Sequence, residues 1–387
     1  MIYLDYNATT PLCDTAWRAM QPYFERHFGN PSSVHRSGRE TRAAIDDARD
    51  RLAALLGAKP HEIIFTSGGT ESNNLAILGL VRNRAPNGKH LISNRAEHHA
   101  VLHALEHLEK RENFEITWLQ VSADGLVDPD ELERALRPDT TLVSVMAANN
   151  ETGVIQPMAE IAARCQKHGV VLHSDMVQSF GKLPTDLAGI DAASFAAHKF
   201  YGPKGAGFLY LRSGLPIDRI QFGGAHEGER RPGTENAPAI VGMAAAAEEV
   251  LRDLPNEQER EARLRDELWS GIKHVAPDAQ QNAAAARRLA NTLNVSFPGV
   301  SSETMLMALD LAGIGASSGS ACMVGSVMAS HVLLAMGLSS ERAASAIRFS
   351  LGKETAAAEI QETVAAIDRI LQRNRQFAGE VTSHATV

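Results

Sequence analysis

Cysteine is scarce in this sequence, with only Cys13, Cys165 and Cys322 among 387 residues. An odd and sparse set of thiols is poor material for a disulfide framework and is typical of a reducing cytosol, so we expect a cytoplasmic protein. Cys165 lies in AEIAARCQKHG, where helical spacing indicates a buried structural residue. Cys13 follows a turn that contains proline and is interpreted in the same way.

Blocks of basic residues and long apolar runs are also missing. The net charge is −8, and no run of Lys and Arg is long enough to grip a phosphate backbone, which argues against direct nucleic-acid binding and against adhesion to an anionic membrane. The opening MIYLDYNATTPL has no basic region followed by an apolar stretch, so we do not expect it to act as a secretory signal. Residues 311–340 carry no charged side chain, but Gly and Ser interrupt them before the roughly 20 apolar residues of a membrane span.

The length and the hydrophobic pattern predict an α/β protein. Apolar runs that alternate with amphipathic stretches indicate a mostly parallel sheet with helices on both faces. The expected strands are 62–67, 89–94, 115–121, 141–148, 170–175, 191–197 and 207–212. After about residue 250 a charged helical stretch, a strand-like NTLNVSFPG and a helical tail follow. We expect a large domain over 15–257 and a smaller one built from 1–14 and 258–387.

A glycine-rich turn follows the first of these strands, in EIIFTSGGTESNN. Gly68 and Gly69 let the backbone approach a ligand closely, and the N–H groups at the start of the next helix attract an anion. By itself the turn is a weak signal, because Gly-Gly turns end many strands that bind nothing.

Two further segments carry groups that suit a pyridoxal 5′-phosphate (PLP) site. Asp175 ends an apolar strand, where a carboxylate either caps a helix or pairs with a protonated pyridine nitrogen, and Gln178 follows three residues later. Lys199 stands between apolar Ala196–Ala197 and Phe200–Tyr201, which indicates a partly buried amine with a lowered pKa, suited to Schiff-base chemistry.

The C-terminal half adds a thiol and a guanidinium. Cys322 stands in SSGSACMVGSVMAS, a Gly/Ser-rich segment of the kind that carries a reactive thiolate rather than a core cysteine. Arg348 in AIRFSLG offers the planar fork that suits a substrate carboxylate.

These segments, in this order, resemble the class V aminotransferase group of fold-type I PLP enzymes, and AEHHAV (96–101), AANNETG (147–153) and RRPGTEN (230–236) extend the match. The opening YLDYNATTP and the SSGSAC segment narrow the resemblance to the cysteine desulfurases of the NifS/IscS family, group I. It runs from Tyr3 to about Gly352. It implies a mostly parallel seven-stranded sheet in a large domain, a smaller α+β domain, and PLP as the cofactor.

The resemblance implies a role for each candidate residue. Lys199 forms the Schiff base with PLP and moves protons, and Cys322 attacks the substrate sulfur. Asp175 pairs with the pyridine nitrogen and Gln178 with the phenolic oxygen, while His98 stacks on the ring and acts in acid–base steps. The remaining contacts are Gly69, Thr70, His198 and Thr234 at the phosphate, Asn150 at cofactor and substrate, and Arg348 at the substrate carboxylate.

The implied reaction converts L-cysteine to L-alanine, and Cys322 carries the sulfur as a persulfide for iron–sulfur cluster or thio-cofactor synthesis. The implied partners are a second copy of the chain, whose Thr234 reaches into the site, and a sulfur-acceptor or iron–sulfur scaffold protein. No resident metal site is expected, although Cys322 could transiently ligate an iron–sulfur cluster on the scaffold.

Several positions depart from the family pattern. Ala196 replaces a serine that would hydrogen-bond the phosphate, His226 replaces a common glutamine, and Met176 replaces a small residue. After Cys322 the family's SLEPS reads SVMAS, so the choice of acceptor is less well defined than the chemistry. Two alternatives stay open: another class V PLP enzyme (an aminotransferase, a kynureninase-like hydrolase or a selenocysteine lyase), or a degenerate, non-catalytic partner in sulfur transfer.

Overall fold

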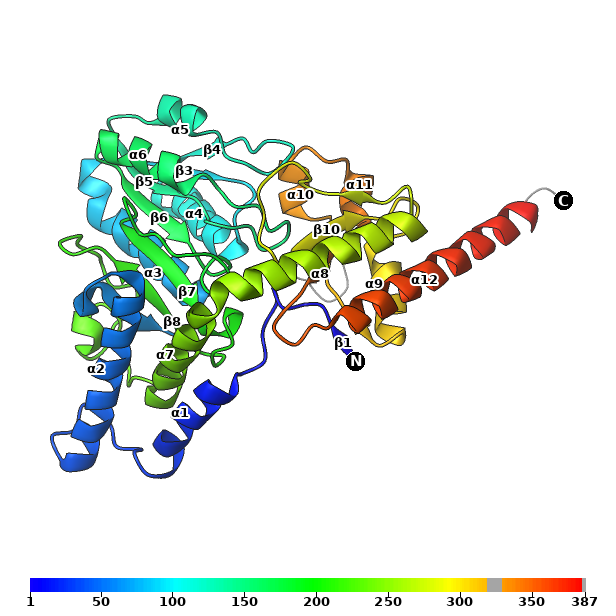
Figure 1. The fold of residues 1–387 in the computed structure, drawn as a ribbon. Coiled ribbons are helices and arrows are strands. Elements are labelled where there is room, and N and C mark those ends of the chain that lie inside the picture. The colour runs from blue at the N-terminus through cyan, green and yellow to red at the C-terminus, as the bar shows by residue number, and fades with distance from the viewer. Residues whose placement is uncertain (319–328, 385–387) are drawn as a thin grey trace.

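A seven-stranded sheet forms the centre of the larger part of the molecule (Figure 1). The computed structural model describes residues 1–318 and 329–384. The sheet order is β2-β8-β7-β6-β5-β3-β4, and β8 is the strand that runs antiparallel to both of its neighbours. The strands are β2 (Ile63–Thr66), β3 (His90–Asn94), β4 (Glu115–Leu119), β5 (Thr140–Ser144), β6 (Val171–Asp175), β7 (Ala192–Ala196) and β8 (Gly207–Leu211). The predicted α/β fold with a mostly parallel seven-stranded sheet is confirmed.

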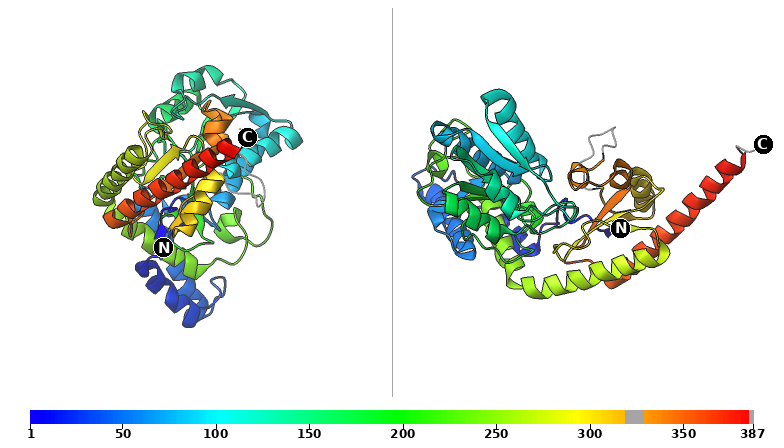
Figure 2. Two further views of the ribbon diagram at one scale, coloured as in Figure 1. Left: turned by 90° about the vertical axis from the view of Figure 1, so that its right-hand side faces the viewer. Right: turned by 90° about the horizontal axis from the view of Figure 1, so that it is seen from above.

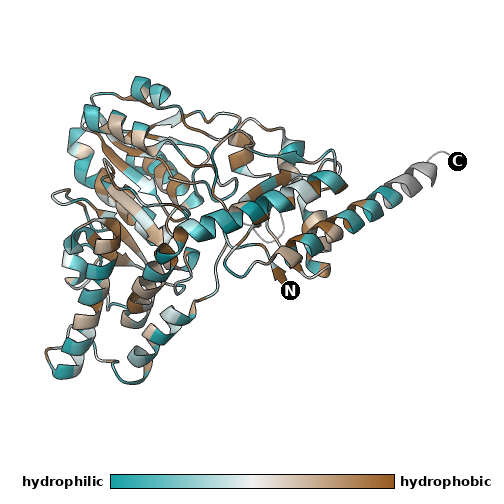
Figure 3. Cartoon of the chain, in the orientation of Figure 1, coloured by the Kyte–Doolittle hydropathy of each residue, from teal (hydrophilic) through white to brown (hydrophobic). Residues whose placement is uncertain are grey.

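Helices cover both faces of this sheet. In β2, Ile64 packs with α3 and α4, whereas Ile63 and Phe65 point to the opposite face, as the alternation of a strand requires. Both faces are apolar, so the central strands are buried along their length, and Figure 3 shows them as brown segments inside helices with hydrophilic outer faces. The helices of this part are α1 (Asp14–Glu25), α2 (Arg36–Leu56), α3 (Gly69–Arg84), α4 (His99–Glu112), α5 (Pro129–Ala135), α6 (Met158–His168) and α7 (Ala237–Arg252).

A second hydrophobic core lies around a small antiparallel sheet, β12-β10-β9. It combines Leu268 of α8, Val295 of β10 and Phe349 of β12 with Ile2 and Leu4 from the N-terminus. Its elements are β1 (Ile2–Tyr3), α8 (Leu254–Val275), β9 (Gln280–Gln281), β10 (Thr292–Ser296), α9 (Ser302–Leu311), β11 (Ile314–Gly315), α10 (His331–Ala335), α11 (Ser340–Ala344), β12 (Ala346–Ser350) and α12 (Ala357–His384). Both chain ends therefore contribute to this core.

Helix α8 connects the two parts. Figure 2 shows it running from the end of α7 along the large part to the second core, while the end of α12 extends away from the body. The predicted domain boundary at residue 257 falls inside α8, in its first turn. The division into domains at this residue stays a prediction. Among the residues described, no helix is long and apolar enough to cross a bilayer.

Candidate active site

The predicted cofactor residues follow three strands whose carboxyl ends lie on the same side of the sheet. β6 and β7 run parallel, and β2, antiparallel to β8, points the same way as β7. Asp175 ends β6, the Gly68–Gly69 turn follows β2, and Lys199 ends the 3-10 turn η3 (Ala197–Lys199) after β7. This is the edge at which α/β sheets bind ligands.

Lys199 reaches the N-terminal segment of the chain. Its Nζ donates to the carbonyl oxygens of Asn7 at 2.6 Å and Ala8 at 2.7 Å. Burial, with a smaller effect of the nearby Arg348 cation, lowers the pKa of Lys199 to about 8. A neutral, nucleophilic amine is therefore far more populated near neutral pH than for an ordinary lysine.

Asp175 is held by two donors. Asn73 of α3 donates Nδ2 to Oδ2 at 2.7 Å, and the backbone N–H of Val177 donates to Oδ1 at 2.9 Å. The carboxylate is buried, so a cationic partner next to it would be strongly favoured. A protonated pyridine nitrogen would be such a partner.

Gln178 lies between Lys182 and the N-terminal segment. Its Nε2 donates to the carbonyl oxygen of Asn7 at 2.8 Å, and its Oε1 accepts from Nζ of Lys182 at 2.7 Å. The donor end of this buried amide is therefore next to the atom that also receives Lys199.

The Gly-rich turn and the start of α3 form an anion cradle. No side chain caps α3, so its first N–H groups keep no acceptor within the helix. Gly69 packs so closely that a Cβ there would lie 2.6 Å from Cγ2 of Val177 and 3.5 Å from Cβ of Ala196. Thr70 opens the first turn and is exposed.

A carboxylate and a histidine flank the cradle. Burial alone would raise the pKa of Glu71, but hydrogen bonds from Arg231 and Ser67 outweigh it and lower the pKa. Nδ1 of His198 lies 3.1 Å from Oγ1 of Thr9, and burial lowers the pKa of His198 to about 4, so its ring is neutral. A neutral imidazole keeps one N–H to donate to a phosphate.

His98 lies near Asp175 and Lys199, and Asn150 contacts Arg348. His98 caps α4, and its Nδ1 accepts from the N–H of Ala100 at 3.1 Å. The residue keeps an exposed surface, yet the surrounding protein desolvates the ring and lowers the pKa of His98, which favours a neutral imidazole with the proton on Nε2. Oδ1 of Asn150 is buried and has no hydrogen-bond partner.

Arg348 belongs to β12 and is 4% exposed. Its Nη2 donates to Oδ1 of Asp5 at 2.6 Å and its Nη1 to the carbonyl oxygen of Asn150 at 2.9 Å. The Nε is buried without a partner. Because a buried, unsatisfied donor of a cation is costly, the guanidinium can accept an additional anion.

Two predicted residues are not placed at this cluster by the described part of the chain. Cys322 lies outside the described residues, as does most of the segment that follows it. Thr234 is exposed, just after the segment that carries Arg231. Ala196 and Met176 are buried, and the imidazole of His226 contacts Ser32 and the N–H of Gly233.

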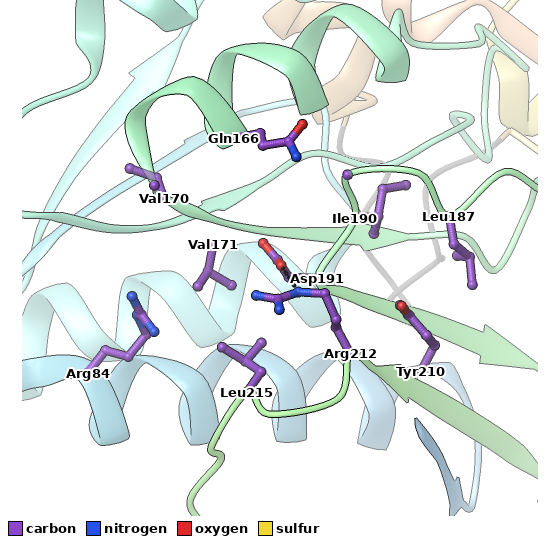
Figure 4. A pocket seen from close by; sticks show the side chains of 12 residues that line it. Arg84, Gln166, Val170, Val171, Leu187, Ile190, Asp191, Tyr210, Arg212 and Leu215 are labelled. Atoms are coloured by element: carbon purple, nitrogen blue, oxygen red, sulfur yellow. Dashed lines mark hydrogen bonds and ion pairs between the residues drawn. The ribbon is translucent and has the colours of Figure 1, made fainter. Parts of the chain in front are cut away.

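A separate pocket of about 420 Å³ lies at the opposite edge of the sheet (Figure 4). It is lined by Val171 at the start of β6, Ile190 and Asp191 before β7, and Arg212 after β8. None of the predicted site residues that the structure describes lines it. Within residues 1–318 and 329–384, no cluster of three or more His, Cys, Asp or Glu side chains could hold a metal ion.

The residues present fit PLP. The cradle at α3 suits the phosphate of PLP, and the buried Asp175 suits its protonated pyridine nitrogen. The amine of Lys199, with its lowered pKa, suits a reaction with its aldehyde. The unpaired Oδ1 of Asn150 and Nε of Arg348 are buried polar atoms for which a bound ligand would supply partners.

Residues 2–363 of this chain match the model of the family described as Aminotransferase class-V. A Cysteine desulfurase IscS from Dictyoglomus turgidum is 46% identical over 97% of this chain and 96% of its own length. A Cysteine desulfurase IscS from Methanosarcina thermophila is 42% identical over 97% of this chain and 93% of its own length. A solved NifS-like protein is 36% identical, with a TM-score of 0.91 over 96% of this chain and 99% of its own.

The chain therefore belongs to the class V aminotransferases, a family of PLP-dependent enzymes. Within that class it belongs to the cysteine desulfurases of the IscS/NifS family. The predicted family, cofactor and enzyme class are confirmed.

Sequence reasoning missed four residues that contact the predicted site. Asp5 and Asn7 hold Arg348 and Lys199, Asn73 holds Asp175, and Lys182 holds Gln178. A signal existed for Lys182, because it follows Gln178 at a spacing of four residues in QSFGK. The backbone oxygen of Asn7 has no signature in the sequence.

Proposed function

We propose that this chain removes sulfur from L-cysteine and leaves L-alanine, with Cys322 as the sulfur acceptor. The observation that carries the proposal is the spacing of two cations along the N-terminal segment. Nη2 of Arg348 contacts Asp5, and Nζ of Lys199 contacts Asn7 and Ala8. The two side chains therefore contact backbone positions only a few residues apart. A guanidinium that can bind a carboxylate and a reactive amine at such a spacing could bind the two functional groups of a small α-amino acid. One relative of known structure, 35% identical, is described as SspA in complex with cysteine.

The protein groups divide the work as follows. When bound, PLP supplies an electron sink for charge that develops at the carbon next to the amine. Arg348 orients the substrate carboxylate, and Lys199, with its pKa of about 8, accepts and returns a proton near neutral pH. Asp175 would keep the pyridine nitrogen protonated, and neutral His98 would offer the proton on Nε2 as a hydrogen-bond donor.

The sulfur step balances without an external oxidant. The Cys322 thiol and L-cysteine give a Cys322 persulfide and L-alanine: the substrate C–S bond breaks, an S–S bond forms, and the β-carbon gains a proton. A sulfur-acceptor or iron–sulfur scaffold protein then takes the sulfur, for cluster or thio-cofactor synthesis.

A homodimer is part of this proposal. Large apolar side chains stay exposed at Phe24 near the end of α1, at Phe28 after that helix and at Phe222 ahead of Thr234, with exposed fractions of 59%, 76% and 83%. Burial of such side chains against a second chain would stabilise an interface. Thr234, exposed in one chain, would then reach the phosphate of the other. Mixed dimers of Lys199→Ala and Thr234→Ala subunits should be more active than either variant alone, because one site per dimer is intact.

The decisive experiment compares the wild type with Cys322→Ala. With L-cysteine and a thiol reductant, the wild type should release sulfide and alanine in equal amounts. Cys322→Ala should still bind L-cysteine and change the colour of the cofactor, but lose the persulfide. A keto acid as the product would contradict the proposal and favour transamination.

A further inference from the structure

Lys182 occupies the position behind Gln178 that decides how this amide is oriented. Nζ of Lys182 donates to Oε1 of Gln178 at 2.7 Å, and Nε2 of Gln178 points the other way, to the Asn7 carbonyl oxygen at 2.8 Å. That same oxygen accepts from Nζ of Lys199 at 2.6 Å. The donor end of the glutamine therefore lies close to the reactive amine.

The two ends of a glutamine amide have nearly the same shape but opposite hydrogen-bonding character. The neighbours therefore decide which end faces a ligand. A lysine ammonium has three donors and no acceptor, so it can bind only the oxygen end. A hydrogen-bond acceptor in the place of Lys182 would favour the reverse orientation and turn Oε1 toward the cleft.

The orientation matters because of the chemistry of PLP. Its phenolic oxygen is on the ring carbon next to the one that bears the aldehyde, so it lies close to Nζ of Lys199 once the two are joined. This oxygen carries negative charge and needs a donor, whereas an amide oxygen facing it would repel it.

We propose that Lys182 is a positioning residue for the cofactor, which holds Oε1 of Gln178 so that Nε2 faces the phenolic oxygen of PLP. The inference rests on the proposed function and deepens it. Lys182 acts through Gln178 and contacts neither cofactor nor substrate in this assignment.

The surroundings of Lys182 support a fixed position. It lines a small cavity of about 20 Å³, roughly the room of one water molecule, together with Tyr201, Glu261 and Lys353. Its carbonyl oxygen accepts from Gln258 of α8 at 2.5 Å, which ties its backbone to that helix. Burial lowers the pKa of Lys182 to about 7 and raises that of Glu261 to about 8. At pH 6 the lysine is therefore predominantly an ammonium.

The test measures the affinity of PLP for the cofactor-free protein at pH 6, by absorbance titration. Lys182→Met should weaken binding by about tenfold or more, as expected for the loss of a hydrogen bond to a charged oxygen. In a Gln178→Leu background the same change should alter affinity by less than about twofold, because there is no amide left to orient. Lys182→Arg, which keeps an obligate donor, should restore most of the affinity.

Lys353 provides the matched control. It lines the same cavity, but its Nζ binds Glu249 at 2.9 Å. Lys353→Met removes the same charge and should leave PLP affinity within about twofold of wild type. If Lys182→Met fails to fold, as judged by thermal unfolding, Lys182→Gln replaces it. A glutamine side chain can accept a hydrogen bond as well as donate one, so this variant should also weaken PLP binding. The loss should appear only when Gln178 is present and not in the Gln178→Leu background.

Equal losses in both backgrounds, or no loss with Lys182→Met, would overturn the inference, since a general effect of charge does not depend on Gln178. A wild-type protein that binds no PLP would instead overturn the proposed function.

Discussion

Lys199 and Gln178 meet at one atom, the backbone carbonyl oxygen of Asn7, at 2.6 and 2.8 Å. Both side chains come from the large sheet region, whereas Asn7 belongs to the segment that leaves the second core. The predicted active site is therefore closed by the first ten residues of the chain.

The pH dependence of cofactor incorporation should report the environment of Lys199. The neutral amine is the nucleophile and is present above the pKa, so the rate should rise with pH around a midpoint of about 8 rather than the usual lysine value. The measurement is the rate of absorbance change when PLP is added to cofactor-free protein. Because the Arg348 cation helps to lower this pKa, Arg348→Met should move the midpoint upward. A midpoint that stays in place would contradict this account.

Arg348→Lys should separate substrate binding from cofactor binding. The change keeps a positive charge but loses the planar fork, so KM for L-cysteine should rise by about tenfold while PLP affinity stays close to wild type. Arg342→Lys is the control, because Arg342 lies on neighbouring α11 and donates to Asn282 at 2.9 Å. Steady-state kinetics and PLP titration together check the result, and an unchanged KM in Arg348→Lys would refute its role.

Gly69→Ala should weaken the anion cradle. The new methyl group would lie 2.6 Å from Cγ2 of Val177, so either that side chain or the turn must shift. We expect PLP affinity to fall by about tenfold, the equivalent of roughly 1.4 kcal/mol. The double variant with Val177→Ala should recover part of the loss, since it removes the atom in the way. A double variant no better than Gly69→Ala would place the cause elsewhere.

Glu227→Met should destabilise the segment that leads to Thr234. Glu227 is buried, and it binds Arg49 with both carboxylate oxygens and also accepts from the N–H of Phe65. Removing one partner of a buried pair leaves an uncompensated charge and costs about 3–5 kcal/mol. The surface pair of Arg82 and Glu112 is the contrast, because Glu112→Gln should cost less than about 1 kcal/mol. Denaturant unfolding of the two variants makes the comparison.

The central sheet was predictable because buried parallel strands are continuous apolar runs. The runs at 170–175 and 207–212 match β6 and β8, respectively, within one residue at each end. The run at 141–148 is longer than β5, because Val145 and Ala147 remain buried after the strand ends at Ser144. Strands as short as β1 and β11 have too few residues to show any period.

The candidate site was predictable where side chains in a sequence motif carry the chemistry, and it was not predictable where backbone groups make the contacts. Lys199, Asp175 and Arg348 stand out by residue type and context. The Asn7 oxygen that receives Lys199 is 192 residues away from it and is independent of the side chain at position 7. The pairing of Asp5 with Arg348 joins residues 343 apart, which no local pattern encodes.

The N-terminal segment also sets the order in which the enzyme can mature during synthesis. A β-bridge pairs Asp5 with Ser350, and the N–H of Asn7 donates to Oγ of Ser350 at 2.9 Å. A segment that is made early in translation is therefore fixed by β12, which is made several hundred residues later. A nascent chain that has already exposed Lys199 still lacks the carbonyl groups that receive its amine. Stable loading with PLP is therefore expected only once translation has passed residue 350.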